Sequence, residues 1–172
     1  MARRRSVRRY DATKGVSQQE IETLIEAALE APTWKNSETG RYYIATSDEM
    51  KTRLALCLAP QNQSRAEGCA ALVVTTFVAN RAGFSREGTP DNELGNGWGC
   101  YDLGLQNAYM LLKAAEMGID SLVMGLRDAD ALRNLLGIPA EETVVSVIVL
   151  GHRAEEPQRP KRRLVTDVAR FV

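Results

Sequence analysis

The sequence has few of the side chains that carry out catalysis without a cofactor. It holds one histidine and three cysteines in 172 residues, and Cys57, Cys69 and Cys100 form no CxxC pair. This number and spacing match neither a disulfide framework nor a zinc site, so we expect reduced, mostly buried thiols and no metal. His152 directly follows a predicted strand, which favours a surface or packing role. An enzymatic activity would therefore depend on a cofactor.

The chain also lacks a net charge and a long apolar run. It has 22 Lys and Arg against 22 Asp and Glu, which argues against a nucleic-acid binder defined by its overall charge. No apolar stretch approaches the about 20 residues that cross a bilayer, and the basic N-terminus lacks the apolar segment of a secretory signal. We expect a cytoplasmic protein with no membrane or nucleic-acid partner. At about 100–200 residues per domain, residues 1–172 form a single domain.

The first half of the chain predicts two capped helices and two strands. Ser17 and Glu20 form a capping box before an apolar stripe that Pro32 ends. The stripe comprises Ile21, Leu24, Ile25, Ala28 and Leu29. A short strand is expected at residues 41–46, and Ser47 caps a helix that carries Met50, Leu54 and Leu58 on one face. The run AALVVTTFV at residues 70–78 is typical of a central strand.

The second half begins with a polar loop at residues 80–97 and a helix at residues 98–117. That helix is apolar on more than one side, which is typical of a helix in the middle of a fold or in a subunit interface. Strands at 121–124 and 144–150 flank a helix that Asp128 caps and Gly137 ends. The interleaved elements predict an α+β fold of three layers, α/β/α, with a mixed central sheet. Residues 153–172 are expected to form an arm that is too short to fold on its own.

Two basic clusters lie at opposite ends of the chain, RRRSVRR at residues 3–9 and KRR at residues 161–163. Guanidinium groups bind phosphate oxygens in pairs, and a serine hydroxyl adds a neutral donor. If the clusters converge, they form a site for a dianionic ligand. The alternatives are a solvated tail and a patch for nucleic acid or localisation. Both are weakened because Ser6-Val7-Arg8 runs directly into Tyr10 and a capped helix.

The motif RRSVRRY at residues 4–10 resembles the start of the nitroreductase family of FMN-dependent oxidoreductases. The resemblance continues in order along the chain. It includes APTWKNS at 31–37, DLGLQN at 102–107, LLGIP at 135–139, VLG at 149–151 and PKRR at 160–163. No piece is specific alone, but six in the right order span nearly the whole sequence. The resemblance implies a nitroreductase-like fold.

The resemblance also implies roles at the FMN phosphate. Arg4, Ser6 and Arg8 would hold it, and Arg5 would contribute through its backbone or near the flavin ring. The C-terminal cluster would add two further cations. These are Lys161 and Arg163.

Other positions are implied to lie along the flavin ring. Asn36 matches a family asparagine at the polar edge of the ring or the ribityl chain. Counting back from the strand at residues 70–78 places Arg65, with Asn62 beside it, near flavin N1 and O2, where a positive charge would stabilise the reduced flavin. Gly125 and Leu126 fall in the segment whose backbone amide faces flavin N5, and a simple turn is the alternative for that glycine.

The implied function is an oxidoreductase in which NAD(P)H transfers hydride to FMN and a nitroaromatic, quinone or related acceptor takes the electrons in a ping-pong cycle. No catalytic side chain is required. Family members are implied to be homodimers with the flavin at the interface, which suits the apolar helix at 98–117. The chain departs from the family at Glu38, where a glutamine is usual, so the substrate is left open. Glu38, Trp98 and Tyr101 are candidates for the substrate pocket, and core packing is the alternative for Trp98.

Three alternatives remain at this point. A flavoprotein of the same fold could catalyse another reaction, such as dehalogenation, flavin destruction or azole formation. A flavin storage or sensor protein would bind the cofactor without turnover. A protein of a different class would use the basic arm to bind nucleic acid or an acidic partner. Glycines at 95, 97 and 99 lack the spacing and the preceding strand of a dinucleotide fingerprint, so the choice between NADH and NADPH cannot be read.

Overall fold

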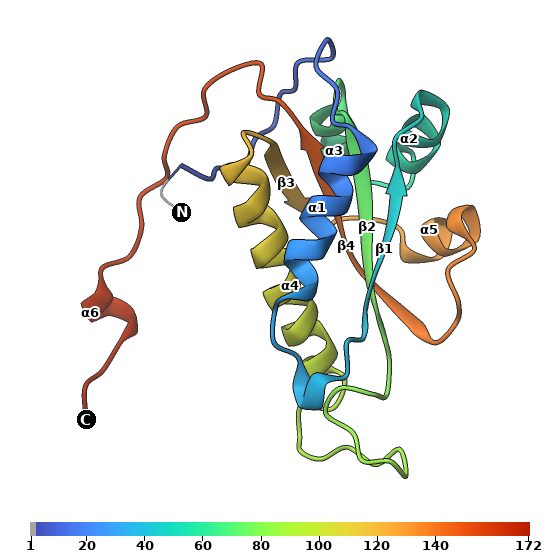
Figure 1. The fold of residues 1–172 in the computed structure, drawn as a ribbon, viewed down its shortest axis with the longest axis vertical. Helices are drawn as coiled ribbons and strands as arrows, with labels where there is room; N and C mark the ends of the chain where they lie inside the picture. Colours follow the sequence, from blue (N-terminus) through green and yellow to red (C-terminus); the bar gives the residue numbers. More distant parts are fainter. Residues whose placement is uncertain (1–2) are drawn as a thin grey trace.

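Four antiparallel strands form the middle layer of the molecule in the computed structural model, which describes residues 3–172 (Figure 1). The strands are β1 (Gly40–Ala45), β2 (Ala71–Val78), β3 (Asp120–Met124) and β4 (Glu142–Gly151). They lie in the order β1-β2-β4-β3, and every pairing between them is antiparallel. The expected mixed character is confined to one isolated parallel bridge, between Ser6 and Ser121. Parallel pairing was the wrong expectation for the strands themselves, because each one returns beside a strand that runs the opposite way.

Helices cover both faces of the sheet and complete the three expected layers (Figure 1). One face carries α1 (Gln18–Leu29) and α4 (Gly97–Glu116), and the other carries α2 (Asp48–Ala55), α3 (Pro60–Ala66) and α5 (Ala129–Leu136). Each face has its own core. On the α1–α4 side the core contains Leu24, Val73, Met110 and Ile148. On the other side it contains Leu54, Val74, Leu132 and Val147.

The predicted helix caps are present. Ser17 and Glu20 form the capping box, Ser47 Oγ accepts the Met50 amide, and Asp128 accepts the Ala131 amide. Two details of the helix predictions were wrong. Leu58 follows the end of α2 and does not share its face. Leu29 is 55% exposed because it lies on the open groove beside the edge strand β1.

The helix α3 was not predicted, and it carries Asn62 and Arg65. Its sequence, PQNQSRA, has no apolar stripe, and only Pro60 at its first turn signals a helix start. None of the helices within residues 3–172 is long and apolar enough to span a membrane.

The C-terminal segment stays attached through Ala154, because Arg153 pairs with Asp120 of β3 and the Ala154 amide donates to the Arg9 carbonyl at 3.0 Å. Beyond these contacts it leaves the sheet and its helices. Every residue from Gln158 to Val172 is exposed, including the single turn α6 (Val165–Val168). Figure 1 shows this segment running away from the three layers.

Candidate functional site

The N-terminal basic segment is fixed to the edge of the sheet. Ser6 bridges to Ser121 of β3, and the Val7 amide donates to the Ser121 carbonyl at 3.0 Å. Val7 and Tyr10 are buried, and the Tyr10 hydroxyl donates to the Val7 carbonyl at 3.0 Å. The arginines of residues 3–9 therefore belong to an anchored segment, which is a different arrangement from a solvated tail.

The anchoring separates the arginines into two sets. Alternate residues of an extended segment point to opposite sides, so Arg4, Ser6 and Arg8 face away from the core that takes Val7. Arg8 reaches back to donate to the Ser6 carbonyl at 3.4 Å. Arg5 donates to the Arg4 carbonyl at 2.8 Å and lines a separate hollow with Arg3, Asp120 and Arg153. Two guanidinium groups and one hydroxyl, those of Arg4, Ser6 and Arg8, therefore belong to one short anchored segment at the β3 edge.

A second group of predicted residues lies where α3 meets the end of β3. The buried Asn62 side chain donates through Nδ2 to the Leu126 carbonyl at 3.1 Å, and Arg65 donates to Asn62 Oδ1 at 3.2 Å. Gly125 and Leu126 are exposed and line an open groove together with residues 56–59. The structure therefore brings Asn62, Arg65 and the 125–126 turn together.

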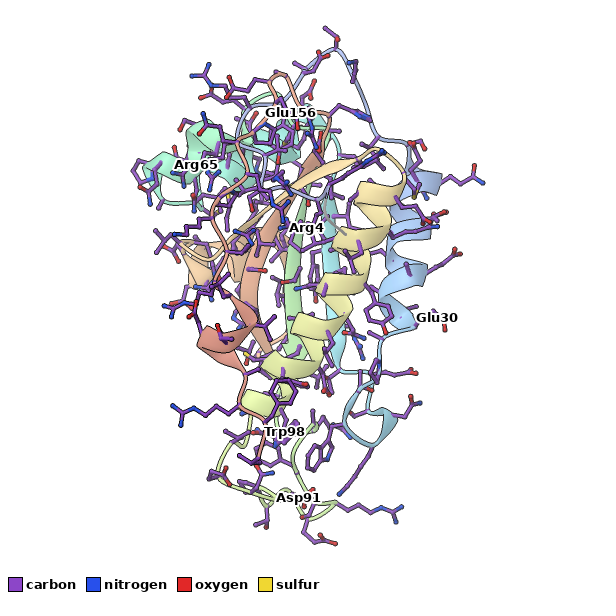
Figure 2. All side chains as sticks on the ribbon, turned by 90° about the vertical axis from the view of Figure 1, so that its left-hand side faces the viewer. Arg4, Glu30, Arg65, Asp91, Trp98 and Glu156 are labelled. Carbon is purple, nitrogen blue, oxygen red and sulfur yellow. The ribbon has the colours of Figure 1, made fainter. Side chains whose placement is uncertain are left out.

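The remaining pocket candidates lie at the opposite end of the molecule. Asn36 Nδ2 donates to Glu38 Oε1 at 3.3 Å. The Trp98 ring lies 4.5 Å from the Trp34 ring and 5.6 Å from the Tyr101 ring, measured between centroids. Figure 2 shows Trp98 at one end of the molecule and Arg4 and Arg65 in the other half. Within one chain, therefore, Asn36, Glu38, Trp98 and Tyr101 do not meet the residues around Arg4 and Asn62.

The loop at residues 33–38 has a strained backbone. Lys35, Asn36 and Glu38 have φ angles of 48°, 54° and 46°. The left-handed region costs an L-residue about 1–2 kcal/mol, and asparagine tolerates it better than lysine or glutamate. Such strain tends to be located at functional sites, where the surrounding structure maintains it.

A buried carboxylate contacts this loop. Asp102, in the second turn of α4, accepts a hydrogen bond from the Trp34 amide at 2.8 Å. The residue is only 3% exposed. Burial raises the pKa of Asp102, and the Trp34 amide bond partly offsets that rise. The sequence identified Asp102 only as part of a family-like helix, because a contact across 68 residues leaves no local pattern.

The predicted C-terminal cations, Lys161 and Arg163, make no hydrogen bond or ion pair with the N-terminal basic segment within residues 3–172. Lys161 and Arg163 are exposed and form no hydrogen bond or ion pair with the part of the chain from residue 3 onward. The apolar side chains after them are exposed as well. These are Leu164, Val165, Val168 and Phe171.

The thiols and the histidine take structural positions. Cys57 and Cys69 are buried, and burial raises the pKa of the Cys69 thiol to about 11. Cys100, near the start of α4, is exposed, so two of the three thiols are buried, as expected of mostly buried cysteines. His152 Nε2 lies 3.2 Å from the Gly15 carbonyl oxygen. Within residues 3–172, no group of three or more His, Cys, Asp and Glu side chains could hold a metal ion.

Comparisons with known proteins identify the family and the fold. Residues 1–152 match the model of the Nitroreductase family. The chain is 24% identical to a Bacillus subtilis protein named "Putative NAD(P)H nitroreductase YdgI", over 99% of this chain and 95% of that protein. Two examples illustrate the solved structures that share the fold. One is a "putative nitroreductase in complex with FMN" from Exiguobacterium sibiricum, with a TM-score of 0.86 and 22% identity over 99% of this chain and 94% of that one. The other is CLA-ER, an enone reductase of gut-bacterial fatty acid saturation, with a TM-score of 0.87 and 19% identity over 100% of this chain and 95% of that one.

Proposed function

The chain belongs to the Nitroreductase family, and we propose that it is an FMN-dependent oxidoreductase that takes electrons from NAD(P)H and passes them to a nitroaromatic, a quinone or a related acceptor. The observation that supports this proposal is the anchoring of the N-terminal segment at the β3 edge, where Ser6 bridges to Ser121 and the Val7 amide donates to Ser121. Arg4, Ser6 and Arg8 belong to that anchored segment. When bound, FMN supplies the redox chemistry.

The residues present fit FMN at both of its polar parts. Two guanidinium groups and a hydroxyl suit a phosphate dianion, because charge-assisted bonds from arginine are strong and paired. The Asn62 amide and the Arg65 guanidinium, linked at 3.2 Å beside Leu126, supply donors for a polar ring edge. A cation there stabilises negative charge on a reduced ring. In this proposal Gly125 and Leu126 offer their backbone to the same ring.

The proposal includes a homodimer in which the flavin site draws on both copies. One chain holds the Arg4 and Asn62 groups at one end and Asn36, Glu38, Trp98 and Tyr101 at the other. A second copy would supply the missing set, and Glu38, Trp98 and Tyr101 would then line the substrate pocket. Exposed apolar side chains support an interface, because soluble monomers rarely leave such surfaces open. On α4 these are Tyr101, 59% exposed, and Tyr109, 43% exposed.

The C-terminal segment has a place in the same proposal. Its exposed apolar residues, with Phe171 at 95% exposure, need a surface to cover them. Arg153 and Ala154 stay bound to their own chain, and we propose that residues 158–172 of the arm lie on the partner copy, which orders Lys161 and Arg163 and lets them join the phosphate site.

The first experiment is the visible spectrum of the purified protein, recorded without oxygen before and after NADH or NADPH is added. The proposal expects flavin bands that bleach with a nucleotide and return when a nitroaromatic or quinone is added. Bands that persist would indicate a flavin-binding protein without this turnover. A colourless protein that does not take up added FMN would contradict the cofactor assignment and leave the basic segment as a partner-binding feature.

A second candidate reaction is reduction of a carbon–carbon double bond conjugated to a carbonyl. It is favoured by the fold shared with the enone reductase CLA-ER. The reduced protein, mixed in separate experiments with an enone and a nitroaromatic, would distinguish the two, because the true acceptor restores the flavin bands faster.

A further inference from the structure

The strain in the chain is concentrated at one loop. Among residues 3–172, four non-glycine residues have a positive φ, and three of them lie at positions 35, 36 and 38. The fourth is Asn80, an amino acid that tolerates this conformation. Lysine and glutamate do not favour it, so the contacts around the 33–38 loop must select this backbone over relaxed alternatives.

Helix α4 supplies those contacts through two side chains one turn apart. Asp102 accepts the Trp34 amide at 2.8 Å, and the Trp98 ring packs on the Trp34 ring at 4.5 Å. Residues four apart share one helix face, so a single face of α4 holds both the backbone and the ring of Trp34. Thr33 Oγ1 accepts the Glu38 amide at 3.2 Å and closes the loop.

The buried Asp102 carboxylate is suited to holding the backbone of the 33–38 loop. Burying a charge is unfavourable unless strong hydrogen bonds compensate. A bond from a backbone amide to a carboxylate is about twice as strong as one to a neutral acceptor. Asp102 is thus suited to holding one particular backbone amide against strain, while its burial keeps it away from substrate.

The loop also has polar groups that the chain does not satisfy. Trp34 Nε1 and Ser37 Oγ are buried without a hydrogen-bond partner among the described residues. Most buried polar groups are paired, so unpaired ones call for a further contact. Both flank Asn36; the α4 contacts hold Trp34, and the Ser37 amide donates to the Trp34 carbonyl at 2.9 Å.

We propose that Asp102 is a positioning residue that holds the 33–38 loop in its strained conformation so that Asn36 and Glu38 meet the flavin site of a second copy. The inference rests on the proposed function, since it assigns the loop to that site. Asp102 acts through the loop backbone and touches neither cofactor nor acceptor.

The first test is amide hydrogen exchange of the full-length protein as purified. Asp102→Leu removes the acceptor at similar size, and Asp102→Asn keeps a neutral oxygen. We expect the Leu variant to speed exchange at residues 34–38 by at least about tenfold, with an intermediate value for Asn and no change in α1 or β2. Glu142→Gln is the matched control: Glu142 is also buried and accepts the hydroxyls of Tyr43 and Thr76. It should leave the loop exchange unchanged.

The second test separates positioning from general stability. At equal flavin content, the Leu variant should raise KM for the acceptor or lower kcat and shift the visible bands of bound flavin, and the Asn variant should partly restore both. Glu142→Gln should lower the melting temperature without either change. Faster loop exchange with wild-type kinetics and spectrum would overturn the proposal, because the loop would then not reach the flavin site.

Other outcomes also decide the question. Wild-type exchange at residues 34–38 in Asp102→Ala, which removes the acceptor with a smaller side chain, would overturn the proposal even if the Leu variant failed to fold. A wild-type protein that bound no flavin would contradict the proposed function. It would also contradict the claim that the 33–38 loop meets the flavin site of a second copy. The exchange experiment would still report whether Asp102 holds the loop.

Discussion

The two groups of candidate residues differ in how the chain holds them. Around Arg4 and Asn62, the backbone is fixed by pairing to β3 and by the bond from Asn62 to the Leu126 carbonyl. Around Asn36, the backbone is left-handed at three positions, and buried polar atoms lack partners among residues 3–172. The first end has its backbone held within one chain, and in the proposed function it receives the FMN phosphate. The second end has the features of a contact made with another copy.

The largest expected effect is at the first end, in the variant Arg8→Ala. Removing a charge-assisted bond to phosphate, worth about 1.5–3 kcal/mol, should weaken FMN binding by roughly tenfold to a hundredfold. The measurement is the dissociation constant from flavin fluorescence.

The neighbouring Arg9→Ala is the matched control. Arg9 is exposed and forms a surface ion pair with Glu155 at 3.5 Å, a kind of contact that contributes little. Its FMN affinity should equal that of the parent protein. If both variants bind FMN equally well, Arg8 does not contact the phosphate.

A smaller effect on FMN binding is expected when the C-terminal segment that would hold the two copies together is removed. Deleting residues 164–172 removes only exposed side chains, so the layers around the sheet should keep their melting temperature. Sedimentation velocity should show a shift from dimer to monomer. FMN affinity should fall by about threefold to tenfold, as expected when a few neutral contacts of about 0.5–1.5 kcal/mol are lost.

The truncated protein retains Lys161 and Arg163, so a loss of affinity cannot be attributed to removal of those charges. A truncated protein that remains dimeric would show that α4 alone makes the interface. A full-length protein that is monomeric with flavin bound would contradict the shared site.

The sequence predicted the first end better than the second, for physical reasons. Strands such as β2 and β4 can be predicted from their continuous runs of β-branched residues. The helix caps at Ser17, Ser47 and Asp128 can be predicted because each lies next to the helix that it starts. Asn62 and Arg65 were placed by counting back from a strand, although the polar helix that carries them was missed. The structure brings Asn62 and Arg65 together beside Leu126, and their role at a flavin stays a prediction.

The second end could not be predicted in the same way. Lys35 and Glu38 are not residues that favour a left-handed backbone, so no propensity signals their strain. The contact between Asp102 and Trp34 joins positions 68 residues apart and depends on how α4 packs. The sequence also could not show whether the strands pair in parallel or antiparallel, because this depends on how they are connected and not on their composition.

The strain itself predicts a stabilising substitution. Glu38→Gly should relieve about 1 kcal/mol of backbone strain at a φ of 46°. For a chain of this size that raises the melting temperature by about 2–4 °C. The same variant should lose substrate selectivity, since the pocket would lose its carboxylate.

Gly137→Ala is the matched control at the end of α5. Gly137 has a φ of 64°, and an added Cβ would meet nothing within 4 Å, so the change adds strain alone. Its melting temperature should fall by about as much as that of Glu38→Gly rises. A lower melting temperature for Glu38→Gly would mean that the Glu38 side chain, through Asn36, contributes more than the strain costs.

The smallest effects expected are in the pH dependence of stability, where the two ends should have opposite signs. Near the anchored N-terminal segment, the Thr13 side chain and amide, followed by Lys14, lower the pKa of Asp11 to about 2. A lowered pKa stabilises the fold above the unfolded value of 3.8, and this contribution is lost as the pH falls toward 2. At the loop, burial raises the pKa of Asp102 above 3.8. Its contribution is therefore fully present below pH 3.8 and lost as the pH rises through the raised value.

Melting temperatures of Asp11→Asn and Asp102→Asn, each compared with the parent protein from pH 2 to 7, measure these signs without interference from other carboxylates. The deficit of Asp11→Asn should grow as the pH rises from 2 to 4, because the parent gains an ionised Asp11 that Thr13 stabilises. Any deficit of Asp102→Asn should shrink as the pH rises above 4, because the parent must then bury a charge that the variant lacks. If the melting-temperature differences of the two variants changed with pH in the same direction, the fold would favour the ionised form of Asp102, as it does for Asp11. The contrast between the two ends would then not extend to their electrostatics.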